Sequence, residues 1–254
     1  SIPVDSEGFG TVEFTAKADK YDANGQQRKT FTAEIAIGEQ TFKEQISYIV
    51  ARPVIQIQSA SVQALYRNCG NKLDVQVPAL GAAYNPSFRV KGGSSQGGRG
   101  GKITIVPTSP TVELSVYSSG TFIGKQKFRA KPIPKPELVL KSGGNEIDLK
   151  RGVSKIPREI TLQAVPDADF AQFLPDDANY RVTKWEVTLA RQQRAIETKQ
   201  VTSTKANLAS FVSKARPGDR IVIEAKEVQR MNFKKEKENV RIGVNSSIKT
   251  VPIN

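Results

Sequence analysis

The stretch FTAEIAI, residues 31–37, decides the fold class of this 254-residue chain. Its apolar side chains are Phe31, Ala33, Ile35 and Ile37. They alternate with Thr, Glu and Ala, so all four fall on one face of an extended strand. Such alternation is typical of half-buried antiparallel strands. The stretch therefore predicts a chain that is mainly β.

The alternation continues on both sides of this stretch. Residues 42–50 and residues 11–16 (TVEFTA) each predict one more strand. Asp22-Ala23-Asn24-Gly25 and Gly38-Glu39-Gln40 lie between the three strands and predict tight turns. Three strands are too few to close a sandwich. We therefore expect residues 1–51 to be the C-terminal part of a β-sandwich domain, completed by strands outside this sequence or by another copy.

The next region, residues 52–130, repeats this pattern in short form. Six short stretches are rich in β-branched and aromatic residues, with turn residues at roughly ten-residue spacing between them. They are residues 54–57, 73–77, 88–90, 103–106, 112–116 and 122–128. About 75 residues with this spacing suit one small sandwich. The region is predicted to be a complete immunoglobulin-like β-sandwich.

A proline-rich segment, RAKPIPKP at residues 129–136, follows. Each proline favours an extended conformation for the residue before it, so residues 131–135 are predicted to be a semi-rigid linker. A docking motif for an aromatic groove is the alternative interpretation.

The remaining residues, 136–254, predict an α+β domain with one short helix. Strands are expected at 160–165, 181–190 and 220–227, with one or two more within 240–253. Residues 168–174 can form a helical turn. The helix is expected over 205–215, with apolar residues at helical spacing. Those residues are Leu208, Phe211, Val212 and Ala215; Ser203 or Thr204 would cap the helix and Pro217-Gly218 would end it.

Composition excludes several classes of active site. The chain has no His and one Cys, so catalytic triads with His, His-ligated metals, Cys-cluster metal sites and internal disulfides are impossible. A hydrolase using Asp167 and Asp169, or a Ser/Lys pair, is the enzyme hypothesis that remains. We expect a protein that is not an enzyme and has no cofactor.

The charge is strongly positive and uneven. The chain has 38 Lys and Arg against 25 Asp and Glu, a net charge of +13. Residues 1–50 have net charge −3, and residues 51–130 and 131–254 each have +8. Such a field favours acidic partners. The mixed run at 230–238 supplies the predicted partner-binding residues Arg230, Lys234, Lys235 and Lys237, although a solvated hairpin tip or a Lys-protected edge strand explains the run as well.

Four other features have plain structural explanations. The glycine-rich residues 92–101 predict a flexible hairpin tip, because no helix follows to make a phosphate cradle. The acids Asp167, Asp169, Asp176 and Asp177 suit a helix cap and a turn better than a Ca²⁺ or acid–base site. Trp185 is expected in the core. Cys69 is expected in a turn, and a reactive thiol is the alternative.

Two segments carry a family resemblance. YIVARPV at residues 48–54, followed by LYRNCGNKL at residues 65–73, is similar to the passage between domains in the GldM/PorM family of gliding-motility and type IX secretion proteins. Asn68 and Cys69 depart from that family's usual wording of the turn. The proline linker and ARPGDRI at residues 215–221 also fit. The resemblance covers the whole chain.

The resemblance implies a non-enzymatic component that spans the periplasm and couples energy to secretion. Such proteins form elongated, rod-like homodimers of stacked immunoglobulin-like domains. A segment absent here would anchor the full-length protein in the inner membrane and meet an inner-membrane motor partner, and residues 136–254 would dock on outer-membrane ring proteins. No nucleic acid and no direct membrane insertion are expected. From the charge alone, the alternative is a basic β-rich module that binds nucleic acid or another polyanion.

Overall fold

The computed structural model describes residues 2–59 and 64–254. They form two compact units, one of Ser1–Gln56 with Gln76–Tyr84 and one of Ile57–Val75 with Asn85–Asn254. Strands predominate throughout, and no helix of the described residues exceeds six residues. The longest, at six residues, is far shorter than the about 20 residues needed to span a bilayer. The chain is mainly β, as predicted.

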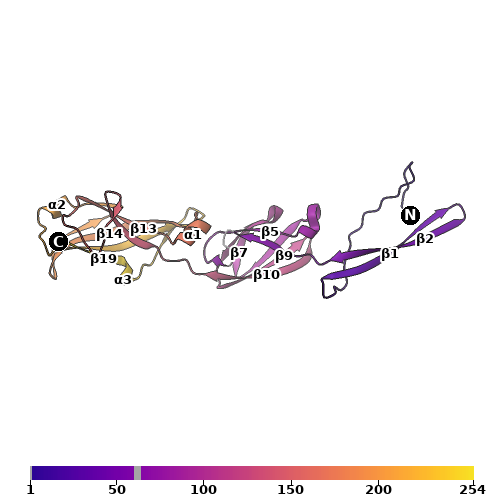
Figure 1. Cartoon of the computed structure of the whole chain (residues 1–254), viewed down its shortest axis with the longest axis horizontal. Helices are drawn as coiled ribbons and strands as arrows, with labels where there is room; N and C mark the ends of the chain where they lie inside the picture. The colour runs from indigo at the N-terminus through magenta and orange to yellow at the C-terminus, as the bar shows by residue number, and fades with distance from the viewer. Residues whose placement is uncertain (1, 60–63) are drawn as a thin grey trace. The chain divides into compact units, whose positions relative to one another are not determined.

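The first unit contains one long antiparallel hairpin (Figure 1), formed by β1 (Gln26–Ile37) and β2 (Gln40–Ala51). Ile37 pairs with Gln40, so Gly38 and Glu39 form a two-residue turn. Gly38 has φ 61°, a conformation that glycine adopts without a steric penalty. The predicted turn is confirmed.

The strand predicted over residues 11–16 is wrong. These residues have no regular secondary structure and pair with no strand of the described chain. Phe14 instead packs edge-on against Phe31 and Tyr48, with ring centroids 6.1 and 5.6 Å apart. Alternating apolar residues are compatible with a strand, but a strand in a sheet also needs a neighbouring strand for its backbone hydrogen bonds. Residues 11–16 have no such neighbour in the described chain, and Phe14 contacts the hairpin through its ring.

The apolar face of the hairpin forms as predicted but is exposed to solvent. Phe31 pairs with Ile46 and Ile35 with Phe42, so these side chains share one face. Their exposed fractions are 42% for Phe31, 59% for Ile35, 54% for Phe42 and 39% for Ile46. The described residues of the first unit form no second sheet.

The second unit begins with a two-sheet sandwich, drawn in magenta in Figure 1. One sheet has the order β4-β10-β9-β6 and the other β3-β5-β8-β7. The strands are β3 (Gln56–Ser59), β4 (Leu65–Tyr66), β5 (Asn71–Gln76), β6 (Pro86–Lys91), β7 (Gly93–Gly97), β8 (Lys102–Pro107), β9 (Thr111–Ser118) and β10 (Thr121–Lys131). Five of the six predicted strands are present where expected; the strand predicted over 54–57 begins only at Gln56, and β4 and β7 were not predicted. Leu114 of β9 and Ile105 of β8 are fully buried in this sandwich.

The glycine-rich stretch is more ordered than predicted. A flexible tip over the whole of residues 92–101 is wrong, because Gly93–Gly97 forms β7 and pairs with β8. A Cβ on Gly93 would lie 2.5 Å from the carbonyl oxygen of Val106, so glycine permits this close pairing. Only the end, including the 3₁₀ turn η2 (Arg99–Gly101), is a hairpin tip.

The remainder of the second unit also packs two sheets together. Their orders are β12-β11-β13-β16 and β15-β14-β17-β18, with β19 also pairing with β17. The strands are β11 (Glu137–Ser142), β12 (Asn145–Glu146), β13 (Glu159–Val165), β14 (Asn179–Arg191), β15 (Arg194–Val201), β16 (Lys205–Asn207), β17 (Arg220–Met231), β18 (Lys237–Asn239) and β19 (Ile248–Pro252). Trp185 is fully buried, and its Nε1 donates to the Ser203 carbonyl at 2.6 Å. Its predicted core position is confirmed.

The single helix predicted over 205–215 is wrong. Lys205–Asn207 is a strand that pairs with β13, placing the buried Ala206 opposite Ile160. The Asn207 side chain then accepts a hydrogen bond from Ala209 N at 2.8 Å, and only Ala209–Val212 is helical (α2). The apolar spacing in residues 205–215 fits a helix, but pairing of Lys205–Asn207 with β13 gives the backbone N–H and C=O groups their hydrogen bonds in a strand instead.

Two further short helices complete this part. α1 (Ala168–Phe173) occurs where a helical turn was expected, and α3 (Val244–Ser247) lies in a segment predicted as strand. Three short helices therefore replace the one predicted. The sheets carry the core, which contains Leu140, Leu162, Val187, Leu189 and Ile223 among others.

Candidate functional site

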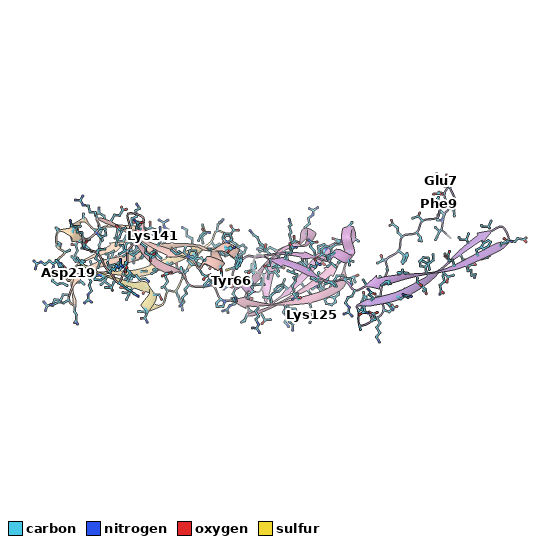
Figure 2. The ribbon with its side chains drawn as sticks, in the orientation of Figure 1. Glu7, Phe9, Tyr66, Lys125, Lys141 and Asp219 are labelled. Atoms are coloured by element: carbon cyan, nitrogen blue, oxygen red, sulfur yellow. The ribbon has the colours of Figure 1, made fainter. Side chains whose placement is uncertain are left out.

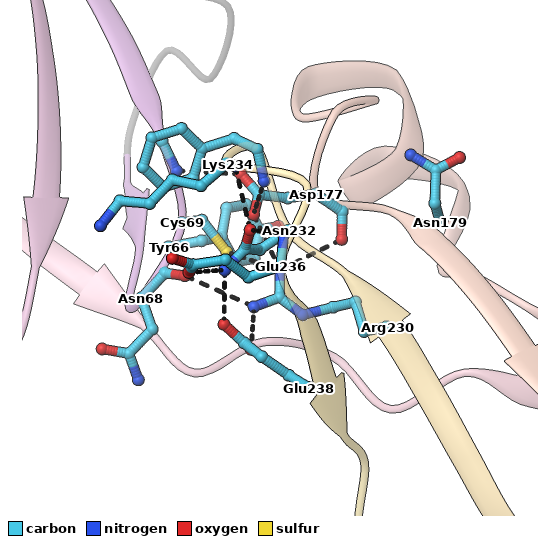
Figure 3. Close-up of polar contacts among 12 residues, drawn as sticks. Tyr66, Asn68, Cys69, Asp177, Asn179, Arg230, Asn232, Lys234, Glu236 and Glu238 are labelled. Carbon is cyan, nitrogen blue, oxygen red and sulfur yellow. Dashed lines mark hydrogen bonds and ion pairs between the residues drawn. The ribbon is translucent and has the colours of Figure 1, made fainter.

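Three loops that lie far apart in sequence meet in a polar junction of the second unit (Figure 3). We define this junction by residues 66–71, residues 175–178 and residues 230–238. The first segment belongs to the sandwich of residues 57–131. The other two belong to the sheets of residues 137–254. The junction therefore connects the two sandwich-like parts.

Arg230 lies at the centre of the junction. It is the second-last residue of β17, and its exposed fraction is 1%. Its Nη1 donates to Asp177 Oδ1 at 2.9 Å and to the Asp177 carbonyl at 3.1 Å. Its Nη2 donates to Glu238 Oε2 at 2.6 Å and to the carbonyl of Asn68 at 3.4 Å. One guanidinium thus binds all three segments.

The Asp177 carboxylate also binds groups from the other segments of the junction. It is also 1% exposed. Its Oδ2 accepts from Gly70 N at 2.9 Å, and its Oδ1 accepts from Phe233 N at 3.1 Å as well as from Arg230. The carboxylate is therefore hydrogen-bonded to all the other segments. A buried ion pair with its remaining hydrogen-bonding sites filled is the arrangement that offsets desolvation.

Two asparagines shape the loops that deliver these groups. Asn71 is buried, and its Nδ2 donates to the carbonyls of Tyr66 and Cys69 at 2.8 and 2.9 Å, which closes the first turn. Asn232 accepts from the N–H groups of Lys234 and Glu236 at 2.9 and 3.0 Å, an Asx-type closure of the β17–β18 loop.

Gly70 allows the loops to approach closely. A Cβ at this position would lie 2.6 Å from the Phe233 ring. The ring also lies beneath the Lys234 ammonium, which is 5.8 Å from its centroid. A side chain on residue 70 would push the β17–β18 loop out of place.

A small apolar cluster lies beside the polar groups. It consists of Cys69, Phe170, Leu174 and Ala178, with Tyr66 and Ile133 packed against it. The Tyr66 and Phe170 rings meet at 5.0 Å in an edge-to-face arrangement. Between β10 and β11, the proline-rich segment contributes Ile133 to this cluster, and Tyr180 Oη donates to the Pro134 carbonyl at 3.3 Å.

The junction shifts the titration of its groups. Burial, aided by the Asp177 charge, raises the pKa of the Cys69 thiol to about 12. Burial likewise raises the pKa of Tyr180 to about 12. For Arg230 burial works against the charged form, but the hydrogen bond to Glu238 and the nearby negative charges raise its pKa overall. The junction thus contains a charged Arg230 and a neutral thiol at physiological pH.

The predicted partner-binding residues divide into two groups. Arg230 is buried and bound to protein groups, so it belongs to the junction and not to an open surface. Lys234, Lys235 and Lys237 are exposed on the β17–β18 loop and β18. Lys235 Nζ lies 4.0 Å from Asp176 Oδ1. Partner binding by these three lysines stays a prediction.

The other candidates have structural roles. Asp167 caps α1, where its Oδ1 accepts from Phe170 N at 3.0 Å, and Asp169 lies in the same first turn. Asp176 pairs with Lys72 at 3.0 Å, which lowers the pKa of its carboxyl. In the described ranges no three acidic or Cys side chains gather as metal ligands. Cys69 is fully buried with a raised pKa, the opposite of a reactive thiol.

The sequence contained one usable signal for the junction. Arg230 stands two residues after Val228, so it occupies an inward position of β17. An inward Arg predicts a buried acidic partner. Nothing local identifies that partner as Asp177, which is 53 residues away.

Comparisons with known proteins agree with the resemblance seen in the sequence. The family model of the GldM third domain matches residues 54–131, and that of the GldM C-terminal domain matches residues 134–254. A search of curated proteins found no match.

Two solved structures also align with the chain. The Yersinia pseudotuberculosis adhesin InvE is 12% identical with a TM-score of 0.23, and the alignment covers 79% of this chain and 58% of that one. Invasin, a bacterial integrin-binding protein, is 11% identical with a TM-score of 0.25, covering 90% and 46%. This chain spans about half the length of these structures. From the two family matches, the chain belongs to the GldM family, a family of structural components of gliding motility and type IX secretion.

Proposed function

We propose that this chain is a non-enzymatic structural and energy-coupling component of the type IX secretion and gliding machinery. In this role it acts in the periplasm and links an inner-membrane motor to an outer-membrane ring. The observation that carries the proposal is the polar junction. Transmitting motion requires that residues 57–131 and 137–254 do not bend against each other. A buried pair such as Arg230–Asp177 resists opening, because opening separates two charges that are hydrogen-bonded inside the protein.

The proposed partners are a second copy of the chain and the ring proteins. The exposed apolar face of the β1–β2 hairpin supports a homodimer, since a two-stranded sheet whose apolar face is largely exposed is marginal alone. Lys234, Lys235 and Lys237 are the proposed contacts with acidic ring proteins. Reversing their charge is expected to weaken ring binding, and unchanged binding would remove this patch from the proposal.

Cys69 offers a direct test of whether the junction stays closed. Its thiol is fully buried, so a thiol reagent such as DTNB can reach it only after the junction opens. We expect native labelling at pH 8 to be at least about a hundredfold slower than labelling of the urea-unfolded chain, since opening limits the rate. The Arg230→Met variant should be labelled faster. Arg129→Met, on an exposed strand position, is the matched control and should react like the native chain.

The same variants can be taken into cells. Arg230→Met and the milder Glu238→Gln are expected to reduce export of a type IX cargo in the order of their labelling rates, at equal protein level. If Cys69 of the native chain were labelled as fast as in the unfolded chain, the junction would be open and rigid coupling would be refuted. If cargo export stayed at the native level while the junction was open, the mechanical role of the junction would be refuted, but membership of the secretion machinery would not.

A further inference from the structure

One sheet of the first sandwich has a strongly cationic outer face. In the sheet β10-β9-β6, Lys127 pairs with Glu113 and Glu113 with Lys91. In the next row, two residues along each strand, Lys125 pairs with Ser115 and Ser115 with Arg89. Because side chains alternate between faces, these residues point away from the core that contains Leu114. Arg129 extends the same face of β10.

We define the cationic face as Arg89, Lys91, Lys125, Lys127 and Arg129. All five are exposed, and Lys125 marks the face in Figure 2. They are half of the ten basic residues of segment 51–130, which has only two acids. β10 and β6 lie on either side of β9, so their basic side chains are about 10 Å apart across the sheet, and alternate residues along one strand are about 7 Å apart. The face therefore gathers five positive charges on one side of the sheet.

Little of this charge is neutralised within the chain. Lys125 pairs with Glu113 at 3.2 Å. Within the part of the chain that the structure describes, no acidic side chain lies within 4 Å of the charged groups of Arg89, Lys91, Lys127 or Arg129. The like charges along each strand are closer than the screening distance in physiological salt, so they repel one another. An anionic partner would remove that repulsion on binding.

We propose that the cationic face is a docking surface for an acidic, carboxylate-bearing face of another protein. Charge complementarity favours such a partner, and the aromatic neighbours fit an interface between proteins. The Arg89 guanidinium lies over the Tyr117 ring at 5.1 Å, which holds its planar group ready for a carboxylate. Phe122, 54% exposed, packs on Tyr117 at 5.4 Å. Arg, Tyr and Phe are enriched in the cores of protein interfaces.

Two observations argue against other anionic partners. Glu113 lies in the middle of the face, where it would oppose a uniformly anionic lipid layer but can fix the register of a partner with mixed charges. Tyr117 is contacted by Arg89 and Phe122, so this ring is less open to stacking by single-stranded bases than a free aromatic platform. The proposal is independent of the junction and of rigid coupling.

The test uses the 254-residue chain and three probes at 50 mM salt: poly-L-glutamate, vesicles containing phosphatidylglycerol, and a single-stranded thymidine oligonucleotide. Poly-L-glutamate is expected to bind most tightly and to be released as salt rises, because exposed charges are screened. The variant Lys91→Gln, Lys127→Gln and Arg129→Gln should weaken that binding by about tenfold or more. These side chains are exposed, so the variant should keep the native circular dichroism.

The matched control is Lys150→Gln, Lys155→Gln and Arg158→Gln, which removes the same charge from three exposed positions outside the cationic face. It should change poly-L-glutamate binding less than about threefold, since it leaves the cationic face intact. If the two variants lost the same amount of poly-L-glutamate affinity, the net charge of the chain would explain the binding, and the proposal would be overturned. Tighter binding of the vesicles or the oligonucleotide than of poly-L-glutamate would also overturn it, in favour of a lipid or nucleic-acid partner.

Discussion

Two long antiparallel strand pairs, β1–β2 and β14–β17, have the same alternating pattern and opposite surroundings. In β14 the side chains of Trp185, Val187 and Leu189 are fully buried. In β1–β2 the corresponding apolar residues Ile35 and Phe42 are 59% and 54% exposed. Alternation thus specifies a strand and its apolar face, but burial requires a second sheet. For β14–β17 that sheet is β11–β13, in the same unit.

The ends of the two pairs differ as well. β17 ends one residue after the buried Arg230, which is bound to groups from three segments. The β1–β2 hairpin has an exposed ion pair, Lys43–Glu34 at 3.2 Å. Loss of the buried positive charge of Arg230 is therefore expected to reduce stability much more than loss of the exposed positive charge of Lys43.

The largest effect should come from Arg230. Arg230→Met leaves the buried Asp177 carboxylate without its cation, which is expected to cost about 3–5 kcal/mol of unfolding free energy. Urea unfolding followed by circular dichroism measures it. In the double variant with Asp177→Leu the loss should be smaller than in Arg230→Met alone, because no buried charge remains unpaired. A loss below about 1 kcal/mol for Arg230→Met would mean that the junction contributes nothing to stability.

A matched pair of truncations tests the comparison of burial directly. Leu189→Ala should cost about 2–5 kcal/mol, since it leaves a cavity in a packed core. Ile35→Ala removes a comparable side chain from the exposed hairpin face and should cost less than about 1 kcal/mol at protein concentrations where the chain is monomeric. Equal losses at low concentration would show that the hairpin face is covered within one chain.

The smallest effect concerns pH. Asp219 is 3% exposed and accepts from Arg191 Nε and Nη2 at 2.8 and 2.9 Å, and this hydrogen-bonded pair lowers the pKa of its carboxyl. A lowered folded-state pKa gives stability that is present above the unfolded value of about 3.9 and is lost as pH falls through the folded value. Thermal unfolding between pH 5 and pH 2 should therefore depend less on pH in Asp219→Asn.

Glu34→Gln is the control for this prediction. It removes the exposed partner of Lys43 in the hairpin, and exposed pairs contribute about 0–1 kcal/mol. If Glu34→Gln flattened the pH dependence as much as Asp219→Asn, the burial of the Arg191–Asp219 pair would not be what matters.

The sequence by itself determined the mainly β class, many of the longer strands, the Gly38 turn and the family. Alternation of Phe31 to Ile37, the short apolar stretches of residues 54–128 and the Gly38 turn are local properties, because side-chain period and backbone φ depend on neighbouring residues. It also excluded catalysis by His and any internal disulfide, since the chain has no His and only one Cys. Local patterns were misleading at residues 11–16 and 205–215, where strand partners decided the outcome.

Only the tertiary structure decided what each face and charge contacts. It placed Arg230 inside with Asp177 and Cys69, from segments 53 and 161 residues away, and it gathered five basic residues from two strands onto one outer face. It also left Ile35 and Phe42 exposed while burying Leu189. The physical reason is that burial and ion pairing depend on which distant segments pack together, and neither periodicity nor composition specifies those partners.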